Sequence, residues 1–250
     1  MQMPHLNRTL LLDLLFPPRC AVCREVTPFG TALCPECVRR LPQALHAAER
    51  CPVCGKPVES CVCREGQPFC FSRAAAAFFY EQDTHYLINC LKTEPQSPAA
   101  GQIAGLMADA FSASGLVGVG PFDAVTEVPM SAGSEARRGH NQAKTLARRL
   151  AALLDIPYLP SPLDCDDKKQ AQHTLSYARR FENVQKSYRR RAGARCAGRI
   201  LLVDDVMTTG ATLDRCAQLL RQCGVGEVCC LTAATTLRWG DAAADSDSKE

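Results

Sequence analysis

The chain has 250 residues and a mass of 27.2 kDa, with 46% hydrophobic and 22% charged residues, which excludes a wholly disordered protein. Lys and Arg outnumber Asp and Glu by only 29 to 26, so net charge alone identifies no class of partner. No stretch approaches the roughly 20 apolar residues that span a bilayer. The apolar stretch Leu10–Phe16 is interrupted by Asp13 and followed by two prolines without a small-residue cleavage site, which argues against a signal peptide. We therefore expect a cytoplasmic protein without stable membrane insertion.

Nine of the 16 cysteines fall between Cys20 and Cys70. In a protein that is not exported, such a concentration indicates metal thiolates rather than disulfides. The first four form two CxxC pairs separated by ten residues, a spacing that suits tetrahedral zinc, with the ligands Cys20, Cys23, Cys34 and Cys37. A thioredoxin-like redox role is disfavoured, because it needs one CxxC after a strand rather than several within 50 residues.

A second cysteine group begins with the pair Cys51 and Cys54. Its partners are irregular, because Cys61 and Cys63 are separated by one residue and Cys70 follows later. A second zinc site can use Cys61 with Cys63, or one of them with Cys70, or the site can be degenerate. The remaining cysteines lie among aliphatic residues and are expected to be small buried hydrophobes.

The rest of the chain alternates expected strands and helices. Strands are expected at residues 73–80, 123–128, 200–203 and 227–232, and helices around residues 103–111, 146–154 and 213–220, with a less certain element at 85–91. This order predicts an α/β fold with a parallel sheet flanked by helices. The expected organisation is a short helix at 1–16, a double zinc ribbon at 17–71 with its own core, a large domain at 72–238, and a disordered tail at 239–250.

The most informative segment runs from Ile200 to Thr212. Four aliphatic residues precede Asp204 and Asp205, and a Thr-Thr-Gly-Ala-Thr turn then opens a helix. Two carboxylates at the end of a strand can accept hydrogen bonds from vicinal ribose hydroxyls, and the turn can present backbone N–H groups to a phosphate. Glycine in the turn lets the backbone approach the anion closely. The segment therefore predicts a ligand with a 5′-phosphate and a pentose diol.

This segment matches at every position the phosphoribosyl pyrophosphate (PRPP) motif of type I phosphoribosyltransferases. The resemblance implies that fold for the large domain. It also implies a set of PRPP-binding residues, namely Val203, Asp204, Asp205, Thr208, Thr209, Gly210, Ala211 and Thr212.

Together with the cysteine ribbon, Leu91-Lys92 and the segment from Val128 to Gln142, the motif resembles the ComF/GntX family from Cys20 to Leu237. That family joins a double zinc ribbon to a phosphoribosyltransferase domain and includes the late competence protein required for DNA uptake. Its Arg-Arg-Gly-Phe-Asn-Gln signature has His140 in place of the aromatic residue here. The irregular second cysteine group is a further departure.

By resemblance, residues 129–142 form a loop on the diphosphate side and residues 168–188 form a mobile hood. The implied catalytic residues are Asp204, Asp205, Arg137, Arg138 and Lys168. Cations are needed there because PRPP carries a diphosphate at C1, and Mg²⁺ on that diphosphate would assist displacement at C1. Zn²⁺ would be structural. Closure of the hood would exclude water from the reacting centre.

Two classes of function follow. The first is an enzyme, a phosphoribosyltransferase acting on an unidentified acceptor. The second is a non-catalytic protein that keeps the PRPP fold and handles single-stranded DNA during competence, together with other competence proteins. For the second, Lys186 to Arg191 is a basic segment with Tyr177 and Phe181 nearby, and such residues can hold phosphates and stack bases.

Overall fold

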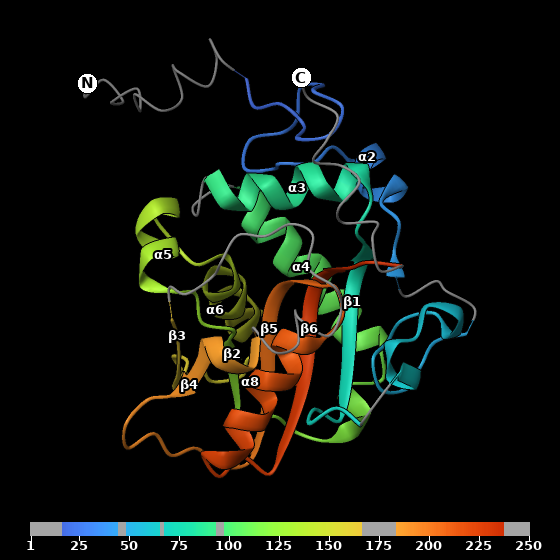
Figure 1. Cartoon of the computed structure of the whole chain (residues 1–250). Helices are drawn as coiled ribbons and strands as arrows, with labels where there is room; N and C mark the ends of the chain where they lie inside the picture. Colours follow the sequence, from blue (N-terminus) through green and yellow to red (C-terminus); the bar gives the residue numbers. More distant parts are fainter. Residues whose placement is uncertain (1–16, 45–48, 66–67, 94–97, 167–183, 238–250) are drawn as a thin grey trace.

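The computed structural model describes residues 17–44, 49–65, 68–93, 98–166 and 184–237 (Figure 1). Its centre is a sheet of four parallel strands in the order β1-β6-β5-β2. The strands are β1 (Arg73–Phe79), β6 (Glu227–Thr235), β5 (Arg199–Met207) and β2 (Ala124–Glu127). The expected helix at 1–16, the tail at 239–250 and most of the expected hood lie outside the described residues.

The central strand β5 explains the layered arrangement. It pairs with β6 on one side and with β2 on the other, and its four aliphatic residues at 200–203 are at most 1% exposed. Alternate side chains point to opposite faces, so Leu201 and Val203 belong to one core while Ile200 and Leu202 belong to another. A continuous aliphatic run is the pattern of a parallel strand covered on both faces.

Helices cover both faces of the sheet. One face is packed by α4 (Pro98–Ala113) and α6 (Gln142–Leu154), with α3 (Gln82–Thr93) beside α4. The other face is covered by α8 (Ala211–Gln222). A short helix, α5 (Ala132–Arg138), precedes α6. The uncertain element at 85–91 is therefore helical, and the predicted parallel sheet flanked by helices is confirmed.

The segment predicted as a polar connection contains a small hairpin. Strands β3 (Leu163–Cys165) and β4 (Tyr188–Arg190) pair in antiparallel fashion. Buried Leu163 and Tyr188 attach this hairpin to the core beneath α8. Each strand has only three residues, and a long polar segment separates the two. The apolar pattern of each strand is therefore too short to predict the pair from the sequence.

The first part of the ribbon shares the core of the large domain, so the expectation of a separate core is wrong. Cys20, Leu33 and Leu41 are buried in the same cluster as residues of α3 and α4. This part also contains the short helix α2 (Pro35–Arg40). In Figure 1 the blue segment lies beside α3 at the top of the view.

The second part of the ribbon docks on the edge strand β1. The N–H of Ala74 donates to the carbonyl oxygen of Val53 over 2.7 Å. Gly55 has φ +72°, and a Cβ at this position would lie 2.3 Å from the carbonyl oxygen of Ala74. Only glycine permits so close an approach. Two 3₁₀ turns, η2 (Val58–Ser60) and η3 (Val62–Glu65), complete this part, and another, η4 (Val117–Val119), precedes β2.

Candidate functional site

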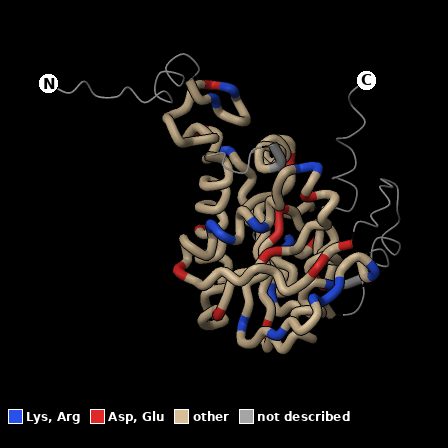
Figure 2. The backbone as a smooth tube through the Cα atoms, turned by 90° about the vertical axis from the view of Figure 1, so that its left-hand side faces the viewer, with Lys and Arg blue, Asp and Glu red and all other residues tan. Residues whose placement is uncertain are grey.

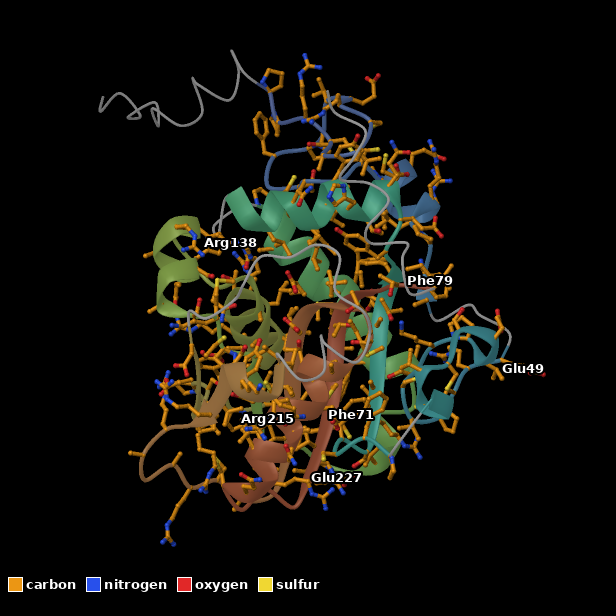
Figure 3. The ribbon with its side chains drawn as sticks, viewed as in Figure 1. Glu49, Phe71, Phe79, Arg138, Arg215 and Glu227 are labelled. Carbon is orange, nitrogen blue, oxygen red and sulfur yellow. The ribbon has the colours of Figure 1, made fainter. Side chains whose placement is uncertain are left out.

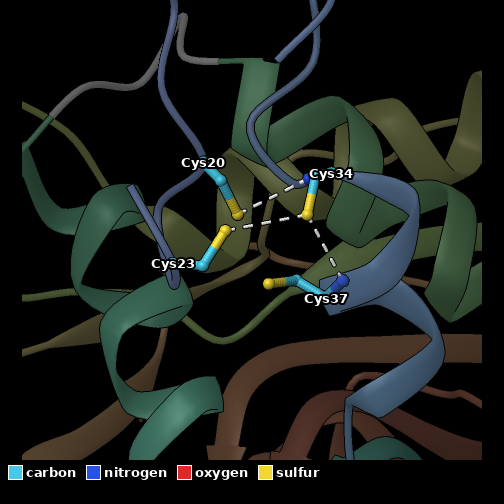
Figure 4. A group of neighbouring side chains, drawn as sticks. All are labelled: Cys20, Cys23, Cys34 and Cys37. Carbon is cyan, nitrogen blue, oxygen red and sulfur yellow. Dashed lines mark hydrogen bonds between the residues drawn. The ribbon is translucent and has the colours of Figure 1, made fainter. Parts of the chain in front are cut away.

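Four sulfur atoms of the first ribbon converge, those of Cys20, Cys23, Cys34 and Cys37 (Figure 4). Each lies within 4.8 Å of the others, and those of Cys23 and Cys34 are 3.8 Å apart. A tetrahedral zinc site with Zn–S bonds of about 2.3 Å has sulfur–sulfur edges of about 3.8 Å. The cluster therefore fits a structural zinc ion.

Backbone N–H groups favour the thiolate form in this cluster. The N–H of Cys34 donates to the sulfur of Cys20 over 3.5 Å, and the N–H of Cys37 donates to the sulfur of Cys34 over 3.4 Å. Burial opposes ionisation of Cys20, but hydrogen bonds from Cys23, Cys34 and Val22 outweigh it and lower the pKa of its thiol to about 6. Burial raises the pKa of Cys37 instead. A bound cation is needed to hold all four sulfurs ionised.

The second cluster resolves the alternatives that the spacing left open. The structure groups Cys61 and Cys63 with Cys51 and Cys54, again with all four sulfurs within 4.8 Å. The Cys51–Cys63 and Cys54–Cys61 sulfur distances are each 3.7 Å, which fits zinc as well. Cys70 lies outside the cluster, where its N–H donates to the Asp214 carboxylate of α8 over 2.6 Å.

The two consecutive acids lie towards the carboxyl end of β5. The carboxylate of Asp204 accepts the N–H of Asp205 over 2.9 Å, and that of Asp205 accepts the N–H of Val206 over 2.8 Å. These bonds orient both carboxylates relative to the backbone. An ionised carboxylate has about four acceptor positions, so each can still accept ligand hydroxyls.

The turn from Thr208 to Thr212 connects β5 to α8. Gly210 is the N-cap of α8 with φ +79°, a left-handed conformation that favours glycine. The ring of Phe69 would lie 3.1 Å from a Cβ at this position. The first N–H groups of a helix have no intrahelical acceptors and attract anions. The turn therefore has the chemistry of a phosphate site.

A cavity of about 210 Å³ lies beside these residues. Its walls join three separate segments of the chain. Asp204, Asp205 and Thr212 come from β5 and α8, Arg138, Asn141 and Gln142 follow β2, and Tyr188 comes from β4. Figure 3 shows Arg138 at the end of α5. The cavity therefore brings two acidic groups, the last residue of the turn and an arginine around one space.

Two neighbouring amides in this wall have opposite surroundings. Asn141 caps α6 through its side-chain oxygen and donates to the carbonyl oxygen of Val128 over 3.0 Å. Gln142 is only 1% exposed, yet neither of its amide atoms has a hydrogen-bond partner among the residues that the structure describes. Both residues belong to the Arg-Arg-Gly-His-Asn-Gln segment, which by itself predicts no separate role for either. The available signal was a polar pair just before a helical pattern. An unpartnered buried amide facing a cavity is suited to a polar ligand.

The other predicted site residues take different positions. Arg137 is exposed on α5, donates to the Ser134 hydroxyl over 3.1 Å and does not line the cavity. Val203 is fully buried, and its carbonyl oxygen accepts the N–H of Val128, so it supports Asp204 from within the sheet. Lys168 lies outside the described residues.

The basic segment is partly neutralised. Arg189 forms ion pairs with Asp164 and Asp166, and Arg191 forms one with Asp164 over 2.9 Å. Arg190 donates to the carbonyl oxygen of Gln222 over 3.0 Å. Figure 2 shows acidic positions interspersed among the basic ones along the backbone. The hairpin therefore presents less free positive charge than its sequence suggests.

The cysteines outside the ribbon are buried hydrophobes only in part, because Cys90, Cys165 and Cys196 are half-buried. Cys216, Cys229 and Cys230 are fully buried in the sheet cores. Burial raises the pKa of each thiol, so all three stay protonated and unreactive at neutral pH.

Comparison with known families supports this description. Residues 11–72 match the double zinc ribbon domain, and residues 136–247 match the phosphoribosyl transferase domain. DNA utilization protein YhgH of Salmonella typhimurium is 27% identical over 210 residues, which cover 84% of this chain and 86% of that protein. Competence protein F of Haemophilus influenzae is 35% identical over 108 residues, which cover 42% of this chain and 47% of that protein. The chain belongs to the ComF family.

The ComF chain has the type I phosphoribosyltransferase fold, with its cysteine ribbon at the N-terminal side. Among solved structures, adenine phosphoribosyltransferase from Thermoanaerobacter pseudethanolicus aligns with 18% identity and a TM-score of 0.38, covering 66% of this chain and 83% of that one. Glutamine PRPP amidotransferase from B. subtilis aligns with 24% identity and a TM-score of 0.34, covering 53% of this chain and 26% of that one. None of the helices that the structure describes is long and apolar enough to cross a membrane.

Proposed function

We propose that this ComF-family protein binds PRPP or a related phosphoribosyl ligand in the cavity beside β5. One observation carries the proposal: the cavity brings Asp204 and Asp205 together with Arg138 and the unpartnered amide of Gln142. In open parallel sheets, ligands bind at the carboxyl ends of the strands, and these acids lie at that end. The family match supplies the ligand class.

Each part of the ligand has a counterpart in the site. The 5′-phosphate would bind the turn from Thr208 to Thr212, where α8 begins. The ribose hydroxyls would donate to Asp204 and Asp205. The diphosphate would lie towards Arg138, with Mg²⁺ neutralising its charge, and hard carboxylate oxygens are suitable ligands for that ion.

The proposed reaction is displacement at C1 of the ribose. The bond from C1 to the diphosphate oxygen breaks, the electron pair leaves with diphosphate, and a bond forms from C1 to the acceptor. Arg138 would stabilise the charge that develops on the leaving diphosphate. Lys168, in the segment after β3, would add a second cation.

The experiment is calorimetry of the whole protein with PRPP and Mg²⁺ and with ribose 5-phosphate, using Asp205→Asn as the test variant. Losing one charge-assisted hydrogen bond costs about 1.5–3 kcal/mol, so affinity should fall by about tenfold to a hundredfold. The melting temperature should be retained, because an amide oxygen can still accept the N–H of Val206. Equal binding by wild type and variant would show that the acids do not hold the ribose.

We also propose that the protein works in DNA utilization or competence. The names of YhgH and of competence protein F support this, and the ion-paired hairpin gives it little local support. Adding a short single-stranded oligonucleotide to the same calorimetry tests whether DNA binds directly and whether it competes with PRPP.

A further inference from the structure

A lysine of the second zinc ribbon reaches the phosphate turn. Lys56 follows Cys54 by two residues, is 1% exposed, and extends its ammonium group between the ends of β5 and β6. The Nζ atom donates to the carbonyl oxygen of Thr208 over 2.6 Å and to that of Thr236 over 2.7 Å. The Thr236 hydroxyl oxygen lies 3.4 Å away. An ammonium group has three N–H donors, and these three acceptors can satisfy them.

The bond to Thr208 fixes the orientation of a peptide group in the turn. A trans peptide is planar, so the N–H of Thr209 points away from the carbonyl oxygen of Thr208. With that oxygen turned towards Lys56, the N–H of Thr209 points to the opposite side of the turn. Under the proposed function, that side faces the 5′-phosphate.

The ammonium group also adds charge close to the turn. Lys56 is buried away from solvent. A buried charge acts over a longer distance than a charge at the surface, because water screens it less. A phosphate bound to the turn would lie on the other side of a single peptide group. The positive charge therefore favours the anion as well as ordering the backbone that binds it.

The position of Lys56 depends on the metal knuckle. Its carbonyl oxygen accepts the N–H of Cys51 over 2.8 Å, and the N–H of Gly55 donates to the carbonyl oxygen of Cys51 over 3.0 Å. These bonds close the turn that carries the zinc ligands Cys51 and Cys54. The first ribbon is held elsewhere, because the Gln102 side chain of α4 accepts the N–H groups of Ala32 and Leu33.

We infer that Lys56 is a positioning residue for the phosphate turn, so that the second zinc ribbon forms part of the phosphoribosyl site while the first does not. This inference rests on the proposed function, because it assigns the turn to a phosphate. It gives the second cluster a role in ligand binding in addition to folding.

The test compares Lys56→Met with Lys144→Met, which makes the same chemical change at a partly exposed lysine outside the cavity wall. Affinities of the whole protein for ribose 5-phosphate and for inorganic pyrophosphate are measured by calorimetry, with zinc content and melting temperature recorded. We expect Lys56→Met to lose at least tenfold in ribose 5-phosphate affinity while pyrophosphate affinity stays within about twofold. Lys144→Met should match wild type for both.

The outcomes separate the two proposals. If wild type binds neither ribose 5-phosphate nor PRPP, the proposed function fails and the inference fails with it. If wild type binds and Lys56→Met binds ribose 5-phosphate equally well, the inference alone is overturned. A parallel loss of pyrophosphate affinity would make Lys56 a merely structural residue and would also overturn it. If Lys56→Met does not fold, Lys56→Gln takes its place, because its amide keeps a donor without the charge.

A second pair of variants tests the link to the metal. Cys54→Ser and Cys23→Ser should each reduce the zinc content by one ion per chain. Only Cys54→Ser should weaken ribose 5-phosphate binding by about tenfold or more. Equal effects of the two variants on binding would contradict a specific role for the second ribbon.

Discussion

The side chain of Gln102 on α4 accepts the N–H of Leu33 over 2.8 Å and thereby joins the first zinc ribbon to the large domain. The same amide oxygen accepts the N–H of Ala32 over 2.6 Å. Leu33 itself is buried with residues of α3 and α4. The first cluster therefore forms part of the boundary of the domain core. It does not belong to a module that folds separately beside that core.

Replacing a first-cluster ligand should destabilise the whole domain. Cys34→Ser should remove one zinc ion per chain and lower the melting temperature of the sheet domain by several degrees, because the ribbon contributes Cys20, Leu33 and Leu41 to the shared core. Differential scanning calorimetry with far-UV circular dichroism checks this. If the variant loses only the local structure of the ribbon and the melting temperature of the sheet domain is unchanged, the two parts do not share a core.

The neighbouring amides Asn141 and Gln142 should respond to substitution in opposite ways. Gln142→Met removes a buried amide that has no partner in the described part of the chain. Stability should be unchanged or increased, since such a group costs about 1–3 kcal/mol. Ribose 5-phosphate or pyrophosphate affinity should fall by about tenfold. Asn141→Ala removes a helix cap and should lower stability by about 1 kcal/mol or more.

Chemical denaturation and calorimetry on the same preparations separate these effects. If Gln142→Met loses stability and keeps full affinity for both probes, Gln142 supports the fold and does not contact the ligand.

Features encoded by consecutive residues were predictable from the sequence. The first zinc cluster follows from two CxxC pairs, and the strand, acids and turn around Asp204 follow from one uninterrupted segment. The alternating order of apolar segments was enough for the parallel sheet. In each case the residues that act together are close in sequence, so their spacing restricts the geometry directly.

Features that depend on distant contacts could not be predicted in this way. Lys56 is 152 residues from Thr208 and 180 from Thr236, and a single lysine after a cysteine pair has no distinguishing pattern. The ion pairs of the β3–β4 hairpin join short segments across a long connection. The choice of Cys61 and Cys63 over Cys70 likewise required the fold, because spacing alone allowed several ligand sets.

Zinc retention should depend on pH, with both clusters losing their metal as the pH falls. In the metal-free protein, hydrogen bonds outweigh burial and lower the pKa of Cys20 to about 6 and that of Cys51 to about 7. Each of these groups is mostly thiolate at pH values above its lowered pKa. It is mostly protonated thiol at pH values below that pKa. Bound zinc lowers the pKa values of its thiol ligands further, so protons should displace zinc only at pH values below these.

The measurement is release of zinc to a chromogenic chelator between pH 5 and 8. Cys54→Ser reports the first cluster alone, and Cys23→Ser reports the second alone. Zinc release that does not increase as the pH falls would contradict thiolate ligation.

The β3–β4 hairpin allows a direct test of DNA binding. Arg189 and Arg191 are held by Asp164 and Asp166, so changing the arginines at 189–191 to Ala should reduce single-stranded DNA affinity only slightly at low salt. The double variant Asp164→Asn with Asp166→Asn releases these arginines and should bind an oligonucleotide more tightly, with a steeper decrease as salt rises, because each phosphate contact releases counterions. Fluorescence anisotropy across a salt series measures both effects. If the triple Ala variant loses most of a strong wild-type affinity, the arginines contact DNA despite their ion pairs and the hairpin is a DNA-binding element. If the double Asn variant gains nothing, the free charge on this hairpin does not attract DNA, and any role in DNA utilization depends on another surface.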